Sequence, residues 1–318
     1  MMKMKIAYLI LAHDQPRHFQ RLINALNSEN VHFYVHVDLK SNILEFDCFK
    51  NVDNISFIKR ISVNHGGFSL TQAMIHLIQA ASESNVFDYF IFLSGKDYPI
   101  KCNNFIFDFL KDCYPKNFID FYHLNEQDPQ FFVTISKYHF VDLIGCSPQV
   151  FKLPLRIAQF ALKKLLPRRS FVKGMLPYRG SQWTCLNRPS VEYVIDFLNS
   201  PKAKNYINFF KYVWGSDEIF FHTLLLNSPH AVDCYHDDNE IKKSRKRLSK
   251  NKYSVGAKLH HIDWSVDRED PAVFDIGDFS ALQESDALFA RKFSESKSEE
   301  LLNCIDELLL SATKSTRA

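Results

Sequence analysis

Glycine is scarce in this sequence, with nine residues among 318. The chain has no G-x-G-x-x-G loop, no G-x-x-x-x-G-K-[ST] loop and no H-E-x-x-H pair. These absences exclude the common glycine-rich loops that hold nucleotide phosphates, and one common zinc-protease motif. Neither sign of charge is in large excess, because the formal net charge is only +3. A field this small does not attract a polyanion, so we expect no nucleic-acid partner.

Cysteine pairs and long hydrophobic runs are also missing. The seven cysteines are scattered and include no Cys-x-x-Cys, which predicts neither a disulfide framework nor a zinc site. Reduced thiols in a cytoplasm are the simplest interpretation. The first apolar run covers only residues 6–12, which is too short for a signal peptide or a membrane span. No later apolar run reaches the length that a membrane span needs. We therefore expect a cytoplasmic protein.

No Asp-x-Asp occurs anywhere in the chain. Many enzymes that use nucleotide-sugars hold a divalent metal on the diphosphate with such a pair. If this protein binds a nucleotide diphosphate, its own cations must neutralise the charge. Arg291 and Lys292 are adjacent cations in an apolar stretch, although such residues often only end a surface helix, and Arg268 is a weaker candidate. The expectation is a site without a metal or any other cofactor.

Alternation of strand and helix patterns runs through the first part of the chain. A short, continuous run rich in Ile and Leu predicts a buried strand at 5–12, and further strands are predicted at 31–38, 55–58 and 87–93, with helices that start at Pro16 and at a Ser69 cap. This order favours an α/β fold, a mostly parallel sheet flanked by helices in a single large domain. Ligands bind beyond the carboxyl ends of strands in such sheets, and His13, Asp38 and Asp97 fall at these ends.

Each strand-end residue also has an ordinary structural alternative. Asp38 suits a ribose or uracil group, or it caps the next turn. His13 lines the same crevice or satisfies a loop backbone, and Asp97 precedes a turn, where aspartate is often structural. Trp264 is a candidate platform for stacking a sugar, whereas a tryptophan of this kind more often belongs to the core.

A basic segment follows the α/β pattern, because residues 143–191 contain nine Lys or Arg and no Asp or Glu. Within it, residues 150–166 predict an amphipathic helix with a basic face, broken or begun at Pro154. Such a helix either lies on an anionic membrane or packs on the core with its polar face in water. A second basic cluster at 242–252 lacks apolar periodicity and predicts a loop that closes over phosphates or is simply solvated.

The segment Trp214-Gly-Ser-Asp-Glu218 brings two adjacent carboxylates to the start of an apolar, helix-periodic run. We expect Ser216 to cap that helix and Asp217 and Glu218 to occupy its first turn, where the dipole favours the charged form. An ionised carboxylate held at a rigid helix start can take a proton from a hydroxyl. The alternative is an ordinary capping box.

Several motifs, in this order, resemble family 14 glycosyltransferases, which include the core-2/I-branching β-1,6-N-acetylglucosaminyltransferases and the peptide O-xylosyltransferases. The resemblance covers residues 4–294. The motifs are Ala7-Tyr-Leu-Ile-Leu-Ala-His13, His36-Val-Asp38, Asn64-His-Gly-Gly-Phe-Ser-Leu70, Leu93-Ser-Gly-Lys-Asp-Tyr-Pro-Ile-Lys101, Gly180-Ser-Gln-Trp183, Ser216-Asp-Glu218, Ile262-Asp-Trp264 and Phe289-Ala-Arg-Lys-Phe293.

The resemblance implies a GT-A-like, Rossmann-type fold and a UDP-sugar donor, with transfer that inverts the anomeric carbon and needs no metal. It implies that Glu218 is the catalytic base and that Arg291 and Lys292 clamp the diphosphate. Residues 1–130 would then form the nucleotide-sugar-binding half, and 131–318 the acceptor-binding and catalytic half with a C-terminal helix. The further contacts we expect are His13, Asp38, Asp97 and Arg268 on the donor side, and Glu126, Gln182, Trp264 and Asp217 on the acceptor side.

Two departures from the family pattern bear on the substrates. The segment after Glu218 looks closer to the xylosyltransferase branch, yet Gln182 stands where that branch has Asp, which argues against transfer to a peptide serine. We also expect none of the anchor, stem and disulfides of the animal enzymes. We expect a bacterial-type enzyme that moves a sugar, N-acetylglucosamine by family precedent, to a glycan or lipid-linked oligosaccharide in surface polysaccharide synthesis, with peripheral contact at the inner membrane face. The alternatives are a UDP-xylose or UDP-glucose donor, and a non-catalytic module that binds glycan or membrane.

Overall fold

The computed structural model describes residues 4–50, 52–84, 86–235, 259–265, 268 and 271–311, and the backbone alone of 253–256. Within these residues the chain folds as a mixed α/β domain with a central mixed sheet flanked by helices, as the alternating pattern predicts. The basic cluster at 242–252 lies outside the described residues.

The central sheet has five strands in the order β3-β2-β1-β4-β8. The first four strands are parallel, and β8 joins β4 antiparallel. All seven residues of β1 are buried, which is why its sequence is one continuous apolar run. The strands of this sheet are β1 (Ile6–Ala12), β2 (Val31–Val37), β3 (Ile55–Phe57), β4 (Tyr89–Ser94) and β8 (Cys185–Asn187).

A second sheet continues from the end of β4 and has the order β5-β11-β10-β9. Its strands come from distant parts of the chain, so that β5, directly after β4, pairs with β11 near the C-terminus. A short third sheet pairs β6 with β7. The bounds are β5 (Asp97–Pro99), β9 (Tyr253–Gly256), β10 (His260–Asp263), β11 (Phe289–Arg291), β6 (Tyr122–His123) and β7 (Tyr178–Arg179).

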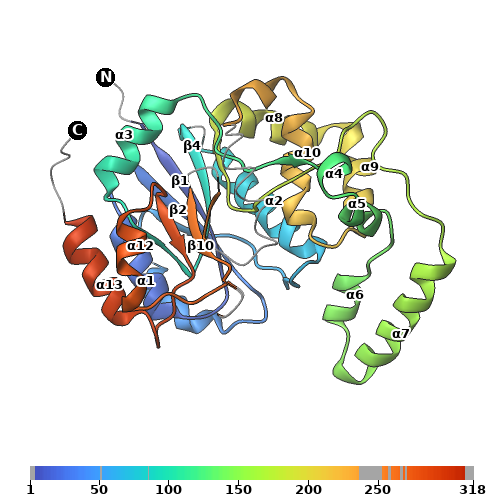
Figure 1. Ribbon diagram of the computed structural model, residues 1–318, viewed down its shortest axis with the longest axis horizontal. Coiled ribbons are helices and arrows are strands. Elements are labelled where there is room, and N and C mark those ends of the chain that lie inside the picture. Colours follow the sequence, from blue (N-terminus) through green and yellow to red (C-terminus); the bar gives the residue numbers. More distant parts are fainter. Residues whose placement is uncertain are drawn as a thin grey trace.

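Helices cover both faces of the central sheet (Figure 1). Alternate residues of β1 point to opposite faces, so Tyr8 and Ile10 join one core with α1, and Leu9 and Leu11 join another with α2, α8 and α10. The helices are α1 (Pro16–Leu26), α2 (Phe68–Ser82), α3 (Asn103–Cys113), α4 (Leu124–Gln127), α5 (Pro129–Ile135), α6 (Val141–Cys146), α7 (Gln149–Leu165), α8 (Arg188–Asn199), α9 (Pro201–Phe210), α10 (Phe220–Leu226), α12 (Phe279–Gln283) and α13 (Glu299–Ile305).

The start of α2 differs from the predicted serine cap. The helix begins at Phe68 and the residue before it is Gly67, so Ser69 is already helical. Its hydroxyl instead accepts a hydrogen bond from the Asn64 amide at 2.8 Å and donates to Asp142 Oδ1 at 2.5 Å. Ser69 therefore ties the loop before α2 to α6, a role that depends on Asp142, which is distant in sequence.

The predicted basic helix is present as α7, but its packing differs from the expected core helix. None of its residues is buried, so the core-helix alternative is wrong. The predicted break at Pro154 is also wrong, because the proline lies inside a continuous helix. Helices α6 and α7 stand away from the central sheet (Figure 1). No helix in the described part of the chain is both long and apolar enough to cross a membrane.

Candidate active site

Parallel pairing brings the predicted strand-end residues to one edge of the central sheet. Ala12 of β1 is the partner of Val37 of β2, and Leu11 is the partner of Ser94 of β4. The amide of Asp38 donates to Ala12 O at 2.9 Å, and that of Gly95 donates to Leu11 O at 2.9 Å. The prediction that these strand ends share one edge is confirmed.

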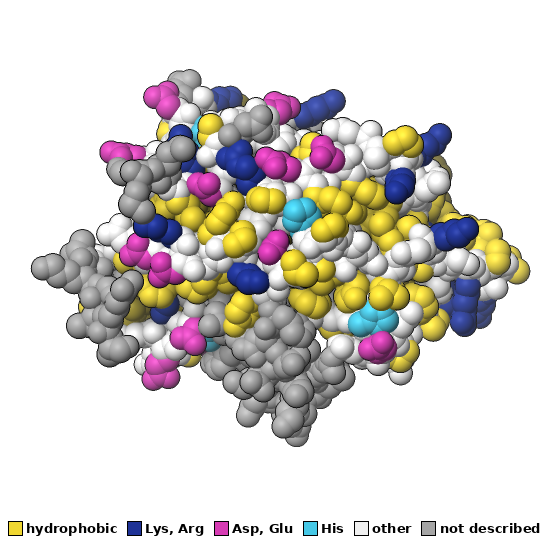
Figure 2. Space-filling view, turned by 90° about the horizontal axis from the view of Figure 1, so that it is seen from above, with side chains coloured by type: hydrophobic (Ala, Val, Ile, Leu, Met, Phe, Trp, Pro, Cys, Tyr) yellow, Lys and Arg dark blue, Asp and Glu magenta, His cyan; other side chains and the backbone are white. Residues whose placement is uncertain are grey.

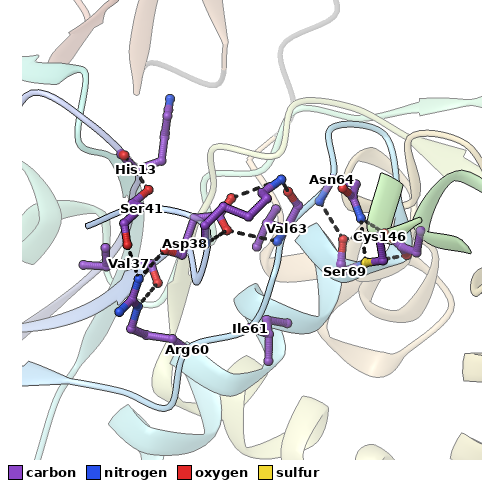
Figure 3. A network of polar contacts seen from close by, with 12 residues as sticks. His13, Val37, Asp38, Ser41, Arg60, Ile61, Val63, Asn64, Ser69 and Cys146 are labelled. Atoms are coloured by element: carbon purple, nitrogen blue, oxygen red, sulfur yellow. Dashed lines mark hydrogen bonds and ion pairs between the residues drawn. The ribbon is translucent and has the colours of Figure 1, made fainter. Parts of the chain in front are cut away.

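Asp38 holds the loops of this edge together (Figure 3). Its Oδ1 accepts hydrogen bonds from the amides of Lys40 at 2.9 Å and Val63 at 3.3 Å. Arg60 lies on the other side and donates to the carbonyls of Asp38 at 2.7 Å and Ser41 at 2.5 Å. The turn-capping role of Asp38 is thus realised, and its role toward a nucleoside stays a prediction.

His13 lies on the same edge with a side chain that is 55% exposed. In Figure 3 its ring points away from Asp38, and its carbonyl accepts a hydrogen bond from Ser41 Oγ at 2.5 Å. Burial is the main cause that lowers the pKa of His13, which favours the neutral ring at neutral pH. A neutral, accessible imidazole can donate to or accept from a ligand at this edge.

Asp97 is the centre of a buried charged cluster where the two sheets meet. It pairs across the strands with Arg291 of β11, whose Nη1 donates to Asp97 Oδ1 at 2.8 Å and also contacts Ser94 Oγ. His260 Nε2 lies 3.2 Å from Asp97 Oδ2, and the Ser94 amide donates to the same oxygen at 2.7 Å. Burial alone would raise the pKa of Asp97, but Arg291 and His260 lower it to about 2.

Arg291 is therefore fixed by Asp97, and its side chain remains partly exposed. Its guanidinium carbon lies 4.5 Å from the centre of the Trp183 ring, and its side chain is 20% exposed. An arginine has five N–H donors, and Asp97 and Ser94 use only part of them. Lys292, the next residue, donates its amide to Ala272 O at 3.4 Å. The two predicted clamp residues thus lie beside the strand ends of the central sheet.

Glu218 is held by an arginine that we did not predict. Arg179 Nε and Nη2 donate to Glu218 Oε2 at 2.8 and 2.6 Å. The Arg179 guanidinium also lies 3.7 Å from the centre of the Phe131 ring, and its Nη1 is 3.5 Å from Asp128 Oδ2. The Glu218 side chain is 35% exposed, so the carboxylate is oriented and still reachable by a ligand.

The capping part of the prediction for this segment is wrong. Residues Ser216–Glu218 form a short 3-10 turn that begins after Gly215, and Ser216 is not the cap. Its hydroxyl is 2.6 Å from Thr71 Oγ1 of α2, an interaction with a helix far away in sequence. The apolar helix α10 starts only at Phe220. The contact with α2 thus decides the geometry of this turn, and the local preference of serine for a capping position does not.

The two adjacent acids of this turn have different environments. Asp217 is only 5% exposed, and its Oδ1 is buried without a hydrogen-bond partner among the residues that the structure describes. Burial, together with the charge of Glu218, raises the pKa of Asp217 to about 7. A buried carboxyl group of this kind is partly protonated at neutral pH, whereas the exposed neighbour is the better placed proton acceptor for a substrate.

A short segment connects the Glu218 side of the site with the Arg291 side. Arg179 pairs with Glu218, and Trp183, four residues later, lies against Arg291. Because an extended chain spans at most about 3.6 Å per residue, the Cα atoms of Arg179 and Trp183 are no more than about 14 Å apart. Gly180 donates its amide to Glu218 O at 2.9 Å, and a Cβ there would lie 1.6 Å from Asp120 O. Only glycine permits this close approach.

Gly66 of the His-Gly-Gly motif supports the turn that carries Asp217 and Glu218. Gly66 has a φ of +72°, and a Cβ added to it would lie 2.6 Å from Trp214 Nε1. Its carbonyl accepts a hydrogen bond from the Gly215 amide at 3.0 Å. Two motifs separated by about 150 residues in the printed sequence thus pack directly together, which holds the Asp217–Glu218 turn against α2.

Four other predicted site residues differ in how firmly they are held. Glu126 is 75% exposed, 3.5 Å from His123 Nδ1, and Gln182 is half-buried. Arg268 Nη1 pairs with Asp278 Oδ1 at 2.6 Å and with Asp263 Oδ2 at 3.1 Å. Trp264 follows β10 and is 40% exposed, so the core alternative does not describe it. Their roles toward donor or acceptor stay predictions.

The described residues contain no group of three or more His, Cys, Asp or Glu side chains arranged to hold a metal ion. Apart from Arg179, which pairs with Glu218, the cations of the candidate site are Arg291 and Lys292. The arrangement therefore offers a carboxylate on one side and positive charge on the other, which is what transfer from a charged leaving group to a hydroxyl requires.

A family model for the Core-2/I-Branching enzyme matches residues 6–283, which is most of the chain. The chain belongs to this family. The resemblance inferred from the motifs is confirmed. Every motif up to Trp264 lies within the matched residues, whereas Arg291 and Lys292 lie just beyond them.

Relatives of this Core-2/I-Branching family member include xylosyltransferases from mammals. Xylosyltransferase 2 of Canis lupus familiaris is 29% identical over 95% of this chain and 33% of its own length. Xylosyltransferase 1 of Rattus norvegicus is 28% identical over 96% of this chain and 35% of its own. The chain thus spans about a third of the length of these relatives. A solved cytidylyltransferase from Leptospira borgpetersenii is 22% identical over 37% of this chain and 52% of its own, with a TM-score of 0.25.

Sequence reasoning missed three residues that build the site of this family member: Arg179, Trp183 as a support for Arg291, and His260 beside Asp97. A signal for Arg179 was present, because it directly precedes the Gly180-Ser-Gln-Trp183 motif. His260 gave none, since its partner Asp97 is 163 residues away.

Proposed function

We propose that this protein is an inverting, metal-independent glycosyltransferase that moves a sugar from a UDP-sugar to a hydroxyl of a glycan acceptor. The observation that carries the proposal is the pairing of Arg179 with the half-exposed Glu218 on the same short segment that places Trp183 against Arg291. A proton acceptor and a cation for the leaving group thereby face one region of the molecule.

In the proposed mechanism, the Glu218 carboxylate takes the proton of the acceptor hydroxyl as that oxygen forms its bond to the anomeric carbon. The bond from this carbon to UDP breaks on the opposite face, which inverts the configuration. Arg291 and Lys292 stabilise the negative charge that develops on the departing diphosphate. These cations take the place that a metal has in enzymes with an Asp-x-Asp pair, which this chain lacks.

The remaining residues would seat the two substrates. His13 and Asp38 support the nucleoside at the edge of the central sheet. Asp97 holds Arg291 in place from behind, because it is fully buried and bonded to the guanidinium. Arg268 would contact the donor while it remains ion-paired with Asp263 and Asp278. The acceptor side would use Glu126, Gln182, Asp217 and Trp264.

Two donor sugars have specific support. N-acetylglucosamine has the precedent of the core-2/I-branching name of the family. UDP-xylose is the second candidate, because the relatives at 28–29% identity are named xylosyltransferases. UDP-glucose stays a third possibility of the same class, and a module that binds glycan without catalysis is the alternative from another class. The presence of both the carboxylate and the cations favours an enzyme.

The acceptor that we propose is a glycan or a lipid-linked oligosaccharide used to build a surface polysaccharide. The reaction would take place in the cytoplasm, at the inner face of the membrane. The balanced net charge supports the absence of a nucleic-acid partner.

Calorimetry and UDP release with a panel of UDP-sugars, in the presence of EDTA, test this proposal. We expect one sugar to bind and to release UDP without added metal. Binding that needs Mn²⁺ would show that the cationic clamp is wrongly assigned. No binding with or without Mn²⁺ would favour the non-catalytic module.

A further inference from the structure

Helix α7 turns its apolar side chains outward. Side chains that follow one another every three or four residues share one face of a helix. Along α7 the exposed fractions are 76% for Val150, 67% for Leu153, 63% for Ile157 and 63% for Phe160. Leu165, at the end of the helix, is 79% exposed. A helix on a globular core has the opposite orientation, with this stripe buried.

The inner face of α7 is mostly polar, with Leu155 as its half-buried apolar residue. Lys152, Gln159 and Lys163 are half-buried, and they follow the same helical spacing on the side away from the exposed stripe. Gln159 Oε1 accepts a hydrogen bond from the Phe140 amide at 2.9 Å, which fixes the helix to the preceding segment. The orientation is thus set by a specific contact, and the apolar face is left without a partner among the described residues.

The charged residues of α7 and of the segment that follows it have only one sign. Arg156 and Lys164 lie on α7 itself, with Arg168 just after it, and all three are exposed. No Asp or Glu occurs from residue 143 to residue 191. The Lys164 ammonium lies 4.6 Å from the centre of the Phe160 ring, so that cation and apolar ring are presented together. At the end of the molecule where α7 lies, Figure 2 shows hydrophobic and Lys or Arg side chains side by side.

We propose that this face, defined by Val150, Leu153, Ile157 and Phe160 with the cations Arg156 and Lys164, is a docking surface for an anionic lipid bilayer. The apolar side chains would enter the boundary between headgroups and acyl chains, and the cations would meet the phosphates. At about 1.5 Å per residue, the apolar strip from Val150 to Phe160 is roughly 15 Å long and can lie in the plane of the membrane.

A second copy of the chain is the competing occupant, and charge argues against it. A two-fold contact brings the same patch of both copies together, so Arg156 and Lys164 would face their own equivalents, and α7 has no acid to pair with them. An anionic lipid surface offers the complementary charge over the whole strip. The proposal is independent of the transfer reaction, because vesicle binding is measured without donor or acceptor.

Cosedimentation of the full chain with vesicles tests the proposal. We expect binding to vesicles of phosphatidylcholine mixed with phosphatidylglycerol, weaker binding to phosphatidylcholine alone, and loss of binding to the mixed vesicles as NaCl is added. The variant Ile157→Ser with Phe160→Ser should bind the mixed vesicles at least about tenfold more weakly, because two apolar side chains no longer enter the bilayer.

The matched control changes two exposed apolar residues elsewhere, Leu44 at 67% and Val232 at 77% exposure, to serine, and should bind like the wild type. Circular dichroism confirms that both variants fold. The proposal is overturned if the wild type does not bind anionic vesicles, or if both double variants bind equally well. A wild-type dimer in light scattering that only the α7 variant loses, without vesicle binding, would assign the face to a second copy instead.

Discussion

Arg179 donates two hydrogen bonds to one oxygen of Glu218, from Nε to Oε2 at 2.8 Å and from Nη2 to Oε2 at 2.6 Å. The second carboxylate oxygen is left for another partner, and the side chain remains 35% exposed. This relationship makes Arg179 a positioning residue: it fixes the direction in which the proposed base presents its free oxygen. A fixed orientation matters because small displacements of a reacting group reduce rates strongly.

Arg179→Ala should reduce the transfer rate by roughly 10–100-fold and leave UDP affinity unchanged, because the base loses its orientation and the donor side is untouched. Arg179→Lys keeps the charge but not the paired hydrogen bonds, and should recover only part of the rate. The measurement is kcat with saturating donor beside the Kd for UDP. Equal losses of kcat and UDP affinity would indicate general damage to the fold.

Arg291→Ala should destabilise the protein by about 3–5 kcal/mol, because it leaves the Asp97 carboxylate buried without its cation. The pKa of Asp97 is lowered from 3.8 to about 2, so its stabilising contribution is complete above pH 4 and is lost as pH falls through 2. The deficit of the variant in urea unfolding should therefore shrink as pH falls from 5 toward 2.

Adding Asp97→Asn to Arg291→Ala separates charge from packing. The double variant has no buried charge to compensate and should recover part of the lost stability, while it still binds UDP poorly. If the double variant is less stable than the sum of both single changes, the ion pair is not the source of the effect.

Asp217→Asn should raise stability at high pH. The folded pKa of Asp217 is raised to about 7 from 3.8, so the folded state holds a proton that the unfolded state has released, and wild-type stability falls as pH rises from 4 to 7. The amide carries no charge at any pH. Urea unfolding at pH 4 and pH 8 should show near equality at pH 4 and a gain for the variant at pH 8.

Gly66→Ala should destabilise the protein and reduce transfer, because a Cβ at φ +72° would lie 2.6 Å from Trp214 Nε1. Gly174→Ala is the matched control: its φ is +80°, and nothing lies within 4 Å of its added Cβ. The control should show only the backbone cost of about 1–2 kcal/mol. Thermal unfolding of both variants measures the difference, which reports on packing against Trp214; equal losses would contradict that packing role.

The strands and the edge of the central sheet could be predicted, because β1, β2 and β4 are rich in aliphatic and aromatic residues and parallel strands end together. The family could be recognised from the order of short motifs. The ends of helices were less predictable: Ser69 and Ser216 have the residue type of a cap, yet Asn64, Asp142 and Thr71 bind their hydroxyls. These partners are up to 145 residues away, and local preference contains no information about them.

The buried cluster and α7 were beyond local patterns for the same reason. In the second sheet β11 pairs with both β10 and β5, and this pairing brings His260 of β10 within reach of Asp97 of β5. The amphipathic pattern of α7 predicted a helix correctly. The pattern does not tell which face of the helix packs on the protein. Gln159, bound to Phe140, decides that the polar face turns inward.

The most direct test of the account is the transfer rate of Glu218→Gln beside its affinity for UDP. The amide keeps the shape of the side chain but cannot accept the proton, so we expect transfer to fall by roughly 10²–10⁴-fold with UDP affinity unchanged. The exposed Glu192→Gln on α8 is the matched control and should behave like the wild type. Transfer by Glu218→Gln at the wild-type rate would contradict the assignment of Glu218 as the base.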